Sequence, residues 1–168
     1  MAEKLLRVRW GRLATGWALM FAAAHFYWAL GGQVGLDVSA GPELAANRPS
    51  WFVAGGLCGV GLLLLAGAGV AMLLDGASSV LPRSVRGARL LVSAGTLAAA
   101  ITLLRGVGLE LLMITGVVQA GEGITEAQIS WTWMVWNPWF VLGGTFFAAA
   151  TLRFCRYVRV PAEGCCGE

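Results

Sequence analysis

The amino-acid sequence predicts an all-α fold: a four-helix transmembrane bundle, in one integral membrane domain covering residues 1–168. Two observations carry this prediction. Hydrophobic residues make up 58% of the chain and charged residues only 12%, and the apolar residues gather in four long runs. Soluble domains average roughly 25% charged residues, and disordered chains combine low hydrophobicity with high charge. The composition therefore argues against both of those classes.

Each apolar run is long enough to cross a hydrocarbon core of about 30 Å at roughly 1.5 Å per residue. Turn-forming Gly and Pro residues lie in the connections between the runs, for example at Gly41-Pro42 and at Pro82. Beyond the last run, a flexible tail is expected over residues 160–168. The predicted transmembrane helices are residues 13–32, 51–74, 90–118 and 131–152.

The positive charges predict the orientation of the chain. Ten of the twelve Lys and Arg residues lie at the two termini and in the connection between the second and third runs. The other two connections hold one cation, Arg48, and four acidic residues. Because cytoplasmic loops retain Lys and Arg, we expect a multi-pass protein of the plasma membrane with both termini cytoplasmic. Anionic lipid headgroups suffice as partners for the basic clusters, so no nucleic-acid partner is expected.

An alternative interpretation makes the first run a cleaved signal peptide. A charged leader precedes this run, and Val38-Ser39-Ala40 has a small-residue cleavage pattern. However, the run holds about 18 to 20 apolar residues, whereas signal peptides have roughly 7 to 15. Its removal would also leave an odd number of helices and disturb the charge asymmetry. The sequence therefore favours a retained helix.

Small residues predict where the helices pack closely. The second run has no charged or amide side chain, and its Gly55, Gly59 and Gly67 would let neighbouring backbones approach. Gly143 and Gly144 have the same predicted role in the fourth run. Both runs therefore contain the small residues expected at helix contacts in a membrane.

Four polar residues interrupt the apolar runs: His25 in the first, Arg105 and Glu110 in the third, and Asn137 in the fourth. Polar and ionisable residues inside a bilayer are costly and mark functional sites or buried pairs. Counting residues puts His25, Arg105 and Asn137 at one level, roughly 18 to 22 Å above the cytoplasmic edge, and Glu110 near the outer interface. Arg105 and Glu110 lie about 140° apart around an α-helix, so pairing them requires a partner on another helix.

Helical spacing also places aromatic residues beside these polar groups. One face of the first run holds Trp17, Phe21, His25 and Trp28, and one face of the fourth holds Trp133, Trp136, Asn137 and Phe140. Two interpretations stay open for Trp136 and Trp139. They belong either to an aromatic belt at the headgroups or to the wall of a cavity for an apolar, planar or cationic guest.

Each polar residue also has a purely structural interpretation. His25 is either a hydrogen-bonded packing residue or an acid–base or ligand-contacting group; metal ligation is disfavoured because no Cys or carboxylate lies at ligand spacing. Arg105 either forms a buried salt bridge or snorkels, or it binds an anionic headgroup. For Asn137, followed by Pro138, a helix kink is the favoured interpretation.

Three segments resemble a family of small bacterial four-helix membrane proteins known only as a domain of unknown function. The first, His25-Phe26-Tyr27-Trp28-Ala29-Leu30-Gly31-Gly32, matches a His-x-Tyr-Trp-Ala-x-Gly-Gly signature; the others are residues 105–110 and 137–143. Asn137 stands where the family usually has Ser, and Glu110 where an Asp is usual nearby. The resemblance covers about residues 13–152. It implies the four-helix fold and the importance of His25 and Arg105, and it implies no activity.

The first functional hypothesis is an enzyme or binding protein that takes a lipophilic small molecule, such as an isoprenoid or a lipid, in an outer-leaflet pocket. Its candidate catalytic residues are Glu110, His25 and Arg105: Glu110 or His25 would transfer a proton, and Arg105 would hold or tune the acid. Proton-initiated isomerase or cyclase chemistry would suit this set. Neither a metal ion nor a cofactor is expected. The candidate ligand-binding residues are Tyr27, Trp28, Trp133, Trp136 and Asn137.

Two other hypotheses remain. An oligomeric transporter or channel component would line a polar path with His25, Arg105 and Glu110. Four helices are few for a monomeric transporter, so this hypothesis needs a homo-oligomer, and the cytoplasmic half offers almost no polar residue to continue the path. In an accessory subunit, the polar residues would only hold the protein's own helices together.

Overall fold

The computed structural model describes residues 9–76, 85–118 and 124–159, and the elements that it describes are helices, which confirms the all-α prediction. The first long helix is α2 (Trp10–Ala29), and the second is η1 (Phe52–Gly59) continued by α5 (Val60–Leu74). The third runs through α6 (Val85–Leu103), η2 (Leu104–Gly108) and α7 (Leu109–Ile114). The fourth runs through α8 (Glu126–Trp131), η3 (Thr132–Trp136) and α9 (Asn137–Arg159).

Three of these helices are long and apolar enough to cross a membrane: Phe52–Leu74, Arg86–Ile114 and Glu126–Arg156. Much of their apolar surface faces outward; Leu63, Leu104 and Met134, for example, are each more than 70% exposed. Exposed apolar surface on this scale is what a lipid environment would cover. The helix α2 is not among the three, because Arg12, His25 and several indole rings lower its mean hydropathy.

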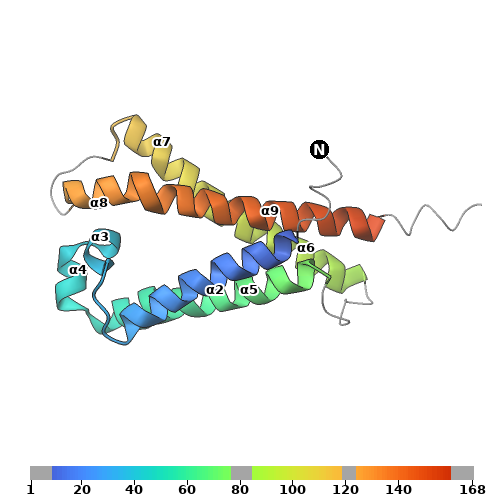
Figure 1. Cartoon of the computed structure of the whole chain (residues 1–168), viewed down its shortest axis with the longest axis horizontal. Helices are drawn as coiled ribbons and strands as arrows, with labels where there is room; N and C mark the ends of the chain where they lie inside the picture. Colours follow the sequence, from blue (N-terminus) through green and yellow to red (C-terminus); the bar gives the residue numbers. More distant parts are fainter. Residues whose placement is uncertain (1–8, 77–84, 119–123, 160–168) are drawn as a thin grey trace, which may run out of the picture.

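The long helices pack as two pairs, α2 with α5 and α6 with α9, and α2 also contacts α9. The pairs come together near the start of α2 and separate toward α3 (Leu36–Ala40) and α4 (Pro42–Asn47), as Figure 1 shows. Between the pairs, the main apolar core is built from buried alanines and aromatic rings. It contains Ala14, Trp17, Ala18, Phe21, Ala68, Ala71, Ala99 and Phe147.

Glycines allow the closest helix contacts. A Cβ atom at Gly143 would lie 2.3 Å from Cε2 of Trp17, and one at Gly144 would lie 2.6 Å from Cγ of Leu103. The predicted packing role of Gly143 and Gly144 is therefore confirmed. Within the second helix, by contrast, the structure leaves the space beside Gly55 open.

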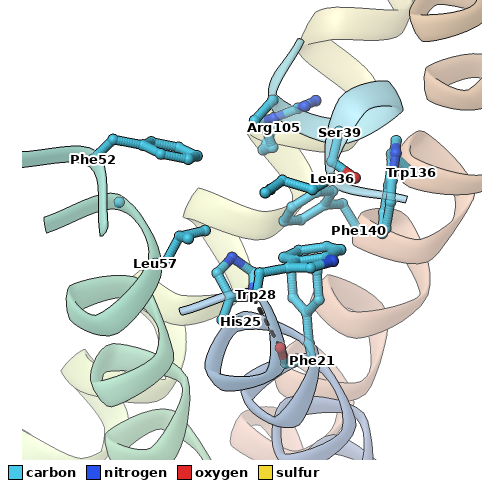
Figure 2. Close-up of a pocket in the computed structure, with 12 residues that line it drawn as sticks. Phe21, His25, Trp28, Leu36, Ser39, Phe52, Leu57, Arg105, Trp136 and Phe140 are labelled. Atoms are coloured by element: carbon cyan, nitrogen blue, oxygen red, sulfur yellow. Dashed lines mark hydrogen bonds between the residues drawn. The ribbon is translucent and has the colours of Figure 1, made fainter. Parts of the chain in front are cut away.

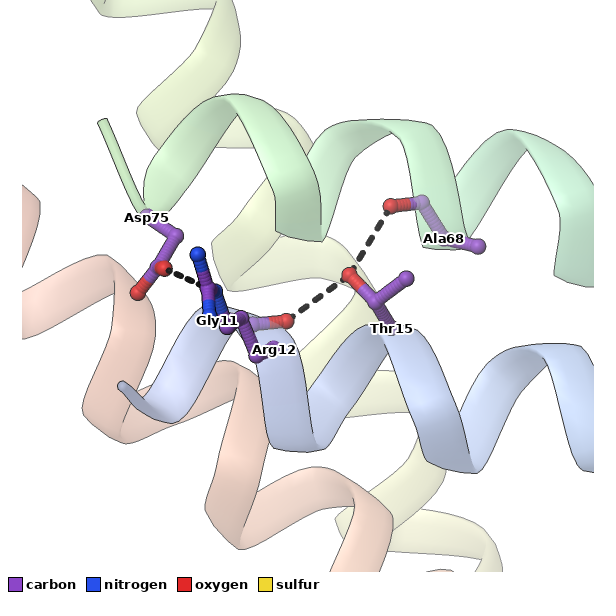
Figure 3. A network of polar contacts seen from close by, with 5 residues as sticks. All are labelled: Gly11, Arg12, Thr15, Ala68 and Asp75. Atoms are coloured by element: carbon purple, nitrogen blue, oxygen red, sulfur yellow. Dashed lines mark hydrogen bonds and ion pairs between the residues drawn. The ribbon is translucent and has the colours of Figure 1, made fainter. Parts of the chain in front are cut away.

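Polar contacts tie α2 to α5 at the end away from α3. There Nε of Arg12 lies 3.6 Å from Oδ2 of Asp75. One turn further along α2, the Thr15 hydroxyl lies 2.8 Å from the Gly11 carbonyl and 3.3 Å from the Ala68 carbonyl of α5 (Figure 3). These contacts hold together the end of the molecule opposite the candidate site.

The helix ends differ from the predicted spans by several residues. The first helix ends at Ala29 rather than residue 32, because the chain turns at Gly31 with φ +109°. The third begins at Val85 and ends at Ile114, rather than running from 90 to 118. The fourth starts at Glu126 rather than residue 131, since Thr125 and Gln128 form a capping box there. The predicted tail, 160–168, lies outside the described residues.

The connection between the first two long helices folds over the α3–α4 end of the bundle. Leu36 of α3 is only 1% exposed and packs with Trp28, Phe52 and Leu57. Arg48 donates hydrogen bonds to the carbonyls of Trp28 and Gly32, at the end of α2. This segment, which the sequence identified only as a connection, closes one end of the space between the helix pairs.

Candidate functional site

A cavity of about 150 Å³ lies at the α3–α4 end, between the helix pairs. We call it the histidine cavity. Its polar groups come from His25 of α2 and Arg105 of η2, and Ser39 of α3 borders it as well. Figure 2 shows how aromatic and aliphatic side chains surround these groups. The apolar wall includes Phe21, Trp28, Leu36, Phe52, Leu57, Trp136 and Phe140.

His25 is held in one tautomer by its own helix. Its Nδ1 lies 2.9 Å from the Phe21 carbonyl oxygen, and a carbonyl can only accept, so Nδ1 carries the hydrogen. In the neutral ring, Nε2 is then an acceptor. The ring is 9% exposed and packs between Phe21, at 4.6 Å between centroids, and Trp28, at 5.4 Å. His25 therefore brings one oriented acceptor to an aromatic cavity.

Arg105 lies at the rim of the cavity, with its side chain exposed. Its guanidinium carbon is 4.9 Å from the centroid of the Phe140 ring, which is cation–π distance. Its Nη1 donates to Oδ1 of Asn137 at 3.4 Å. Among residues 9–76, 85–118 and 124–159, no carboxylate forms an ion pair with Arg105. Its positive charge thus faces the cavity with only neutral partners.

Asn137 joins Arg105 to Glu110. Its amide oxygen accepts from Arg105, and its Nδ2 donates to Oε2 of Glu110. The Asn137 side chain is 2% exposed, and both of its bonds are partly buried. We call these three residues the polar bridge. The partner on another helix that the five-residue spacing required is therefore Asn137, on the fourth helix.

The π-helical segment η2 explains how one amide reaches both charged side chains. In an α-helix Arg105 and Glu110 would point about 140° apart. The wider turns of a π-helix, bonded from i to i+5, reduce the angle between residues five apart. Arg105 lies in η2 and Glu110 in the first turn of α7. Both side chains consequently approach α9 from the same helix.

Glu110 and Asn137 border a second cavity, of about 250 Å³, which we call the glutamate cavity. Apart from these two residues, its wall consists of Gly106, Val107, Leu111, Pro138 and Val141. The four polar residues are thus divided: His25 and Arg105 line one cavity, and Glu110 and Asn137 line the other.

The aromatic candidates divide in a similar way. Trp28 and Trp136 line the histidine cavity, whereas Tyr27 (47% exposed) and Trp133 (39% exposed) line neither cavity. The ring of Tyr27 covers Gly32 instead. In an α-helix, Trp133 and Trp136 would lie on the same face. The wider turns of the π-helical segment η3 separate them around the helix axis. Trp139 stacks on Trp17, at 5.9 Å between centroids, and belongs to the packed core.

Sequence reasoning missed two contributions from the connection after α2. Leu36 seals the cavity wall, and Arg48 caps the end of α2. The sequence signal for Arg48 is its position as the lone cation in an acidic connection. No comparable signal marks Leu36, because a five-residue helix such as α3 is too short to show an apolar period.

Among the described residues, no group of three or more His, Cys, Asp or Glu side chains could hold a metal ion. Comparisons with known proteins give a family without an assigned activity. No curated protein and no solved structure matches the chain. A family model described as "Protein of unknown function (DUF3995)" matches residues 18–147, which include α2 from Ala18 onward and all the residues of both cavities. The chain therefore belongs to this family of proteins of unknown function.

Proposed function

We propose that this chain is a four-pass protein of the plasma membrane, with both termini cytoplasmic, that binds the anionic headgroup of a lipophilic small molecule in the histidine cavity. The proposed ligand is a lipid or an isoprenoid phosphate. The distribution of Lys and Arg supports the orientation. The observation that carries the proposed binding is the guanidinium of Arg105 at the cavity, without an ion-pair partner among the described residues.

An arginine in this position favours an anion. A charged group at membrane depth is costly unless it is paired or reaches water or headgroups. Asn137 and Phe140 give Arg105 only neutral contacts. The planar guanidinium matches the oxygen geometry of phosphate and carboxylate groups, which it binds through two parallel hydrogen bonds. A headgroup of that kind would give the guanidinium the direct ion-pair partner that it lacks among the described residues.

Two further polar groups on the cavity wall suit an oxyacid. His25 presents Nε2 as an acceptor, which fits a protonated oxygen of a phosphate monoester. Trp136 lines the cavity, and its buried indole N–H has no hydrogen-bond partner among the described residues. Such a donor is stabilised when a ligand oxygen accepts from it. Arg105, His25 and Trp136 together form a set of donors and acceptors that a phosphate group would complete.

The size of the cavity supports a headgroup rather than a complete lipid. Pockets for drug-sized ligands usually measure roughly 300 to 1,000 Å³, and the histidine cavity measures about 150 Å³. The tail of the ligand would lie outside, along exposed apolar surface such as that of Trp51, whose ring contacts Phe52 of the cavity wall. The ligand would then enter from the side of the membrane.

Acid–base chemistry on the bound molecule would extend this function. Of the three candidate catalytic residues, His25 and Arg105 border the histidine cavity, and Glu110 does not. A proton transfer there would use Nε2 of His25, with Arg105 holding the anion. Binding is favoured over transport, because the core next to the cavity is packed with Trp17, Phe21 and Phe147 rather than with polar side chains.

The binding test uses purified protein in phosphatidylcholine nanodiscs titrated with decyl phosphate. Tryptophan fluorescence reports binding, because Trp28 and Trp136 line the cavity. Arg105→Gln should weaken binding about tenfold to hundredfold, since a hydrogen bond to a charged group contributes about 1.5 to 3 kcal/mol. The matched control is Arg89→Gln, an exposed cation on the same long helix but far from the cavity. Decanol, which has the same alkyl chain without the phosphate group, is the control for binding of the tail alone.

Equal affinity of wild type and Arg105→Gln for decyl phosphate would exclude this binding site. Equal affinity of wild type for decanol and decyl phosphate would exclude recognition of an anion. Inorganic phosphate is the third ligand: binding of phosphate without a tail at similar affinity would identify a soluble anion rather than a lipid as the natural class.

A further inference from the structure

The polar bridge connects the two cavities through a single buried amide. Asn137 accepts from Arg105 on the side of the histidine cavity and donates to Glu110 on the side of the glutamate cavity. Its orientation is determined by both neighbours. A flipped amide would turn its NH₂ group toward the guanidinium and its oxygen toward the carboxylate, which would lose both hydrogen bonds. A change of charge at one end of the bridge therefore changes the electrostatic energy of the group at the other end.

We propose that binding of an anion at Arg105 is coupled to the uptake of one proton by Glu110. This inference rests on the proposed function of the histidine cavity. Without ligand, the positive charge of Arg105 and the negative charge of Glu110 balance across Asn137. A bound monoanion leaves one excess negative charge beside the polar bridge, where it repels the Glu110 carboxylate. Protonation of the Glu110 carboxylate, with the proton taken from solvent, restores the balance.

The groups around Glu110 favour it as the proton acceptor. Asn137, which donates to Glu110, does not titrate, and neither does Met113, whose sulfur lies 3.9 Å from Nδ2 of Asn137. The other wall residues of the glutamate cavity are apolar. Asn137 can donate to either form of the carboxyl group, so the bridge keeps its geometry when the proton arrives.

His25 is the other titratable group that faces the bound anion, from α2. Its ring lies between Phe21 and Trp28, and its Nδ1–H is already bonded to a carbonyl. A proton on Nε2 would place a new charge between two aromatic rings, whereas a proton on Glu110 removes a charge from an apolar wall. If Glu110 takes the proton, binding to Glu110→Gln should not depend on pH. If His25 takes it, binding to His25→Gln should not depend on pH.

The test measures the affinity for decanesulfonate in nanodiscs between about pH 5.5 and 8. Sulfonate keeps one negative charge over this range, so the ligand contributes no proton. Wild-type affinity should fall as pH rises, by up to about tenfold per pH unit, because one proton favours the bound state. Glu110→Gln is neutral at every pH; it should bind with little pH dependence and about tenfold more tightly than wild type at pH 8.

The matched control is Glu126→Gln, an exposed carboxylate at the start of α8, which should keep the wild-type pH profile. His25→Gln should keep the slope as well. A second measurement needs no variant: in weakly buffered solution with a pH indicator, wild type should take up about one proton for each decanesulfonate bound.

The outcomes distinguish this inference from the proposed function. If wild type binds decanesulfonate through Arg105 with no pH dependence and no proton uptake, the coupling is excluded and the binding function stands. If the slope disappears in His25→Gln and persists in Glu110→Gln, the proton goes to His25 and the inference is wrong. If Arg105→Gln binds as wild type does, the proposed function itself fails.

Discussion

At the scale of single residues, Asn137 has more than the kink-forming role that the sequence favoured. Its neighbour Pro138 follows it inside a continuous helix, at the place where η3 passes into α9. A proline in a helix interior removes one backbone hydrogen bond, and the π-helical turn of η3 lies directly before it. The side chain of Asn137 instead satisfies a cation and a carboxylate that have no ion-pair partner among the described residues.

Asn137→Leu tests this bridging role. The substitution removes the hydrogen bonds that the amide makes with Arg105 and Glu110. It should lower the free energy of unfolding by about 1 to 3 kcal/mol. The cost should be about 1 kcal/mol smaller in a Glu110→Gln background, because the bond to a neutral amide is weaker than the bond to a carboxylate. Unfolding in mixed dodecylmaltoside and SDS micelles gives the free energy of unfolding of wild type, the two single variants and the double variant. Additive effects would mean that Asn137 and Glu110 are not coupled.

Arg48 is a second residue whose role depends on its location in space. It has φ +43°, in the left-handed region, at the end of α4. Its guanidinium caps the carbonyls of Trp28 and Gly32, where a helix C-terminus favours positive charge. These bonds join the connection over the histidine cavity to α2.

Arg48→Gln should loosen that connection. The loss of charge-assisted bonds of about 1.5 kcal/mol should increase hydrogen exchange of the backbone amides in residues 36–47 about tenfold. Exchange in α5 should stay unchanged. Arg86→Gln, an exposed cation on the third helix, serves as the control. Equal exchange in the two variants would show that Arg48 does not hold the connection.

At the scale of elements, π-helical segments decide which side chains meet. The segments η1, η2 and η3 each contribute residues to the histidine cavity: Phe52 and Leu57, Arg105, and Trp136. Single π-turns within helices occur frequently at functional sites. They alter the register on which face analysis of a sequence depends, and this explains why Trp133 was grouped with Trp136 in the prediction.

The contact between α2 and α9 gives a prediction at this scale. Gly143→Ala should lower the free energy of unfolding by about 1 to 3 kcal/mol, because its Cβ would overlap the buried Trp17 ring, which donates to the Trp139 carbonyl at 2.9 Å. Gly16→Ala, also in a helix interior, meets nothing within 4 Å and should be neutral or stabilising by up to about 1 kcal/mol. Thermal unfolding in detergent compares them; equal melting temperatures would contradict close packing at Gly143.

At the scale of the whole molecule, the two helix pairs meet at one end and separate at the other (Figure 1). Arg12 and Asp75 join α2 to α5 at the first end, and α3 and α4 cover the second. Both cavities lie toward the second end. With the proposed orientation, the cavities face the outer leaflet and the packed end faces the cytoplasm.

Reporter fusions test this orientation. Green fluorescent protein at the C-terminus should fluoresce, because the reporter folds in the cytoplasm. Alkaline phosphatase fused after Asn47, in α4, should be active, because that enzyme requires the periplasm. Fusion of alkaline phosphatase after Arg156 is the control and should be inactive. The reverse pattern would mean that the Lys and Arg distribution does not orient this chain.

The sequence alone determined the helical class, the apolar character and the residues on which the candidate site depends. Composition and 3.6-residue periodicity are local properties, and an ionisable side chain in an apolar run is visible without a structure. His25, Arg105, Glu110 and Asn137 were therefore identifiable in advance. Helix ends were less predictable, because caps such as Thr125 and turns such as Gly31 shift them by several residues.

Only the tertiary structure decided how these residues are grouped. The angle between Arg105 and Glu110 depends on a π-helical segment, and π-turns are not evident in an apolar pattern. The division into two cavities depends on which helices pair, and Leu36 reaches the cavity wall through a connection that Arg48 bonds to the end of α2. Side-chain identity sets which chemistry is available, whereas packing between distant segments sets which groups share one space.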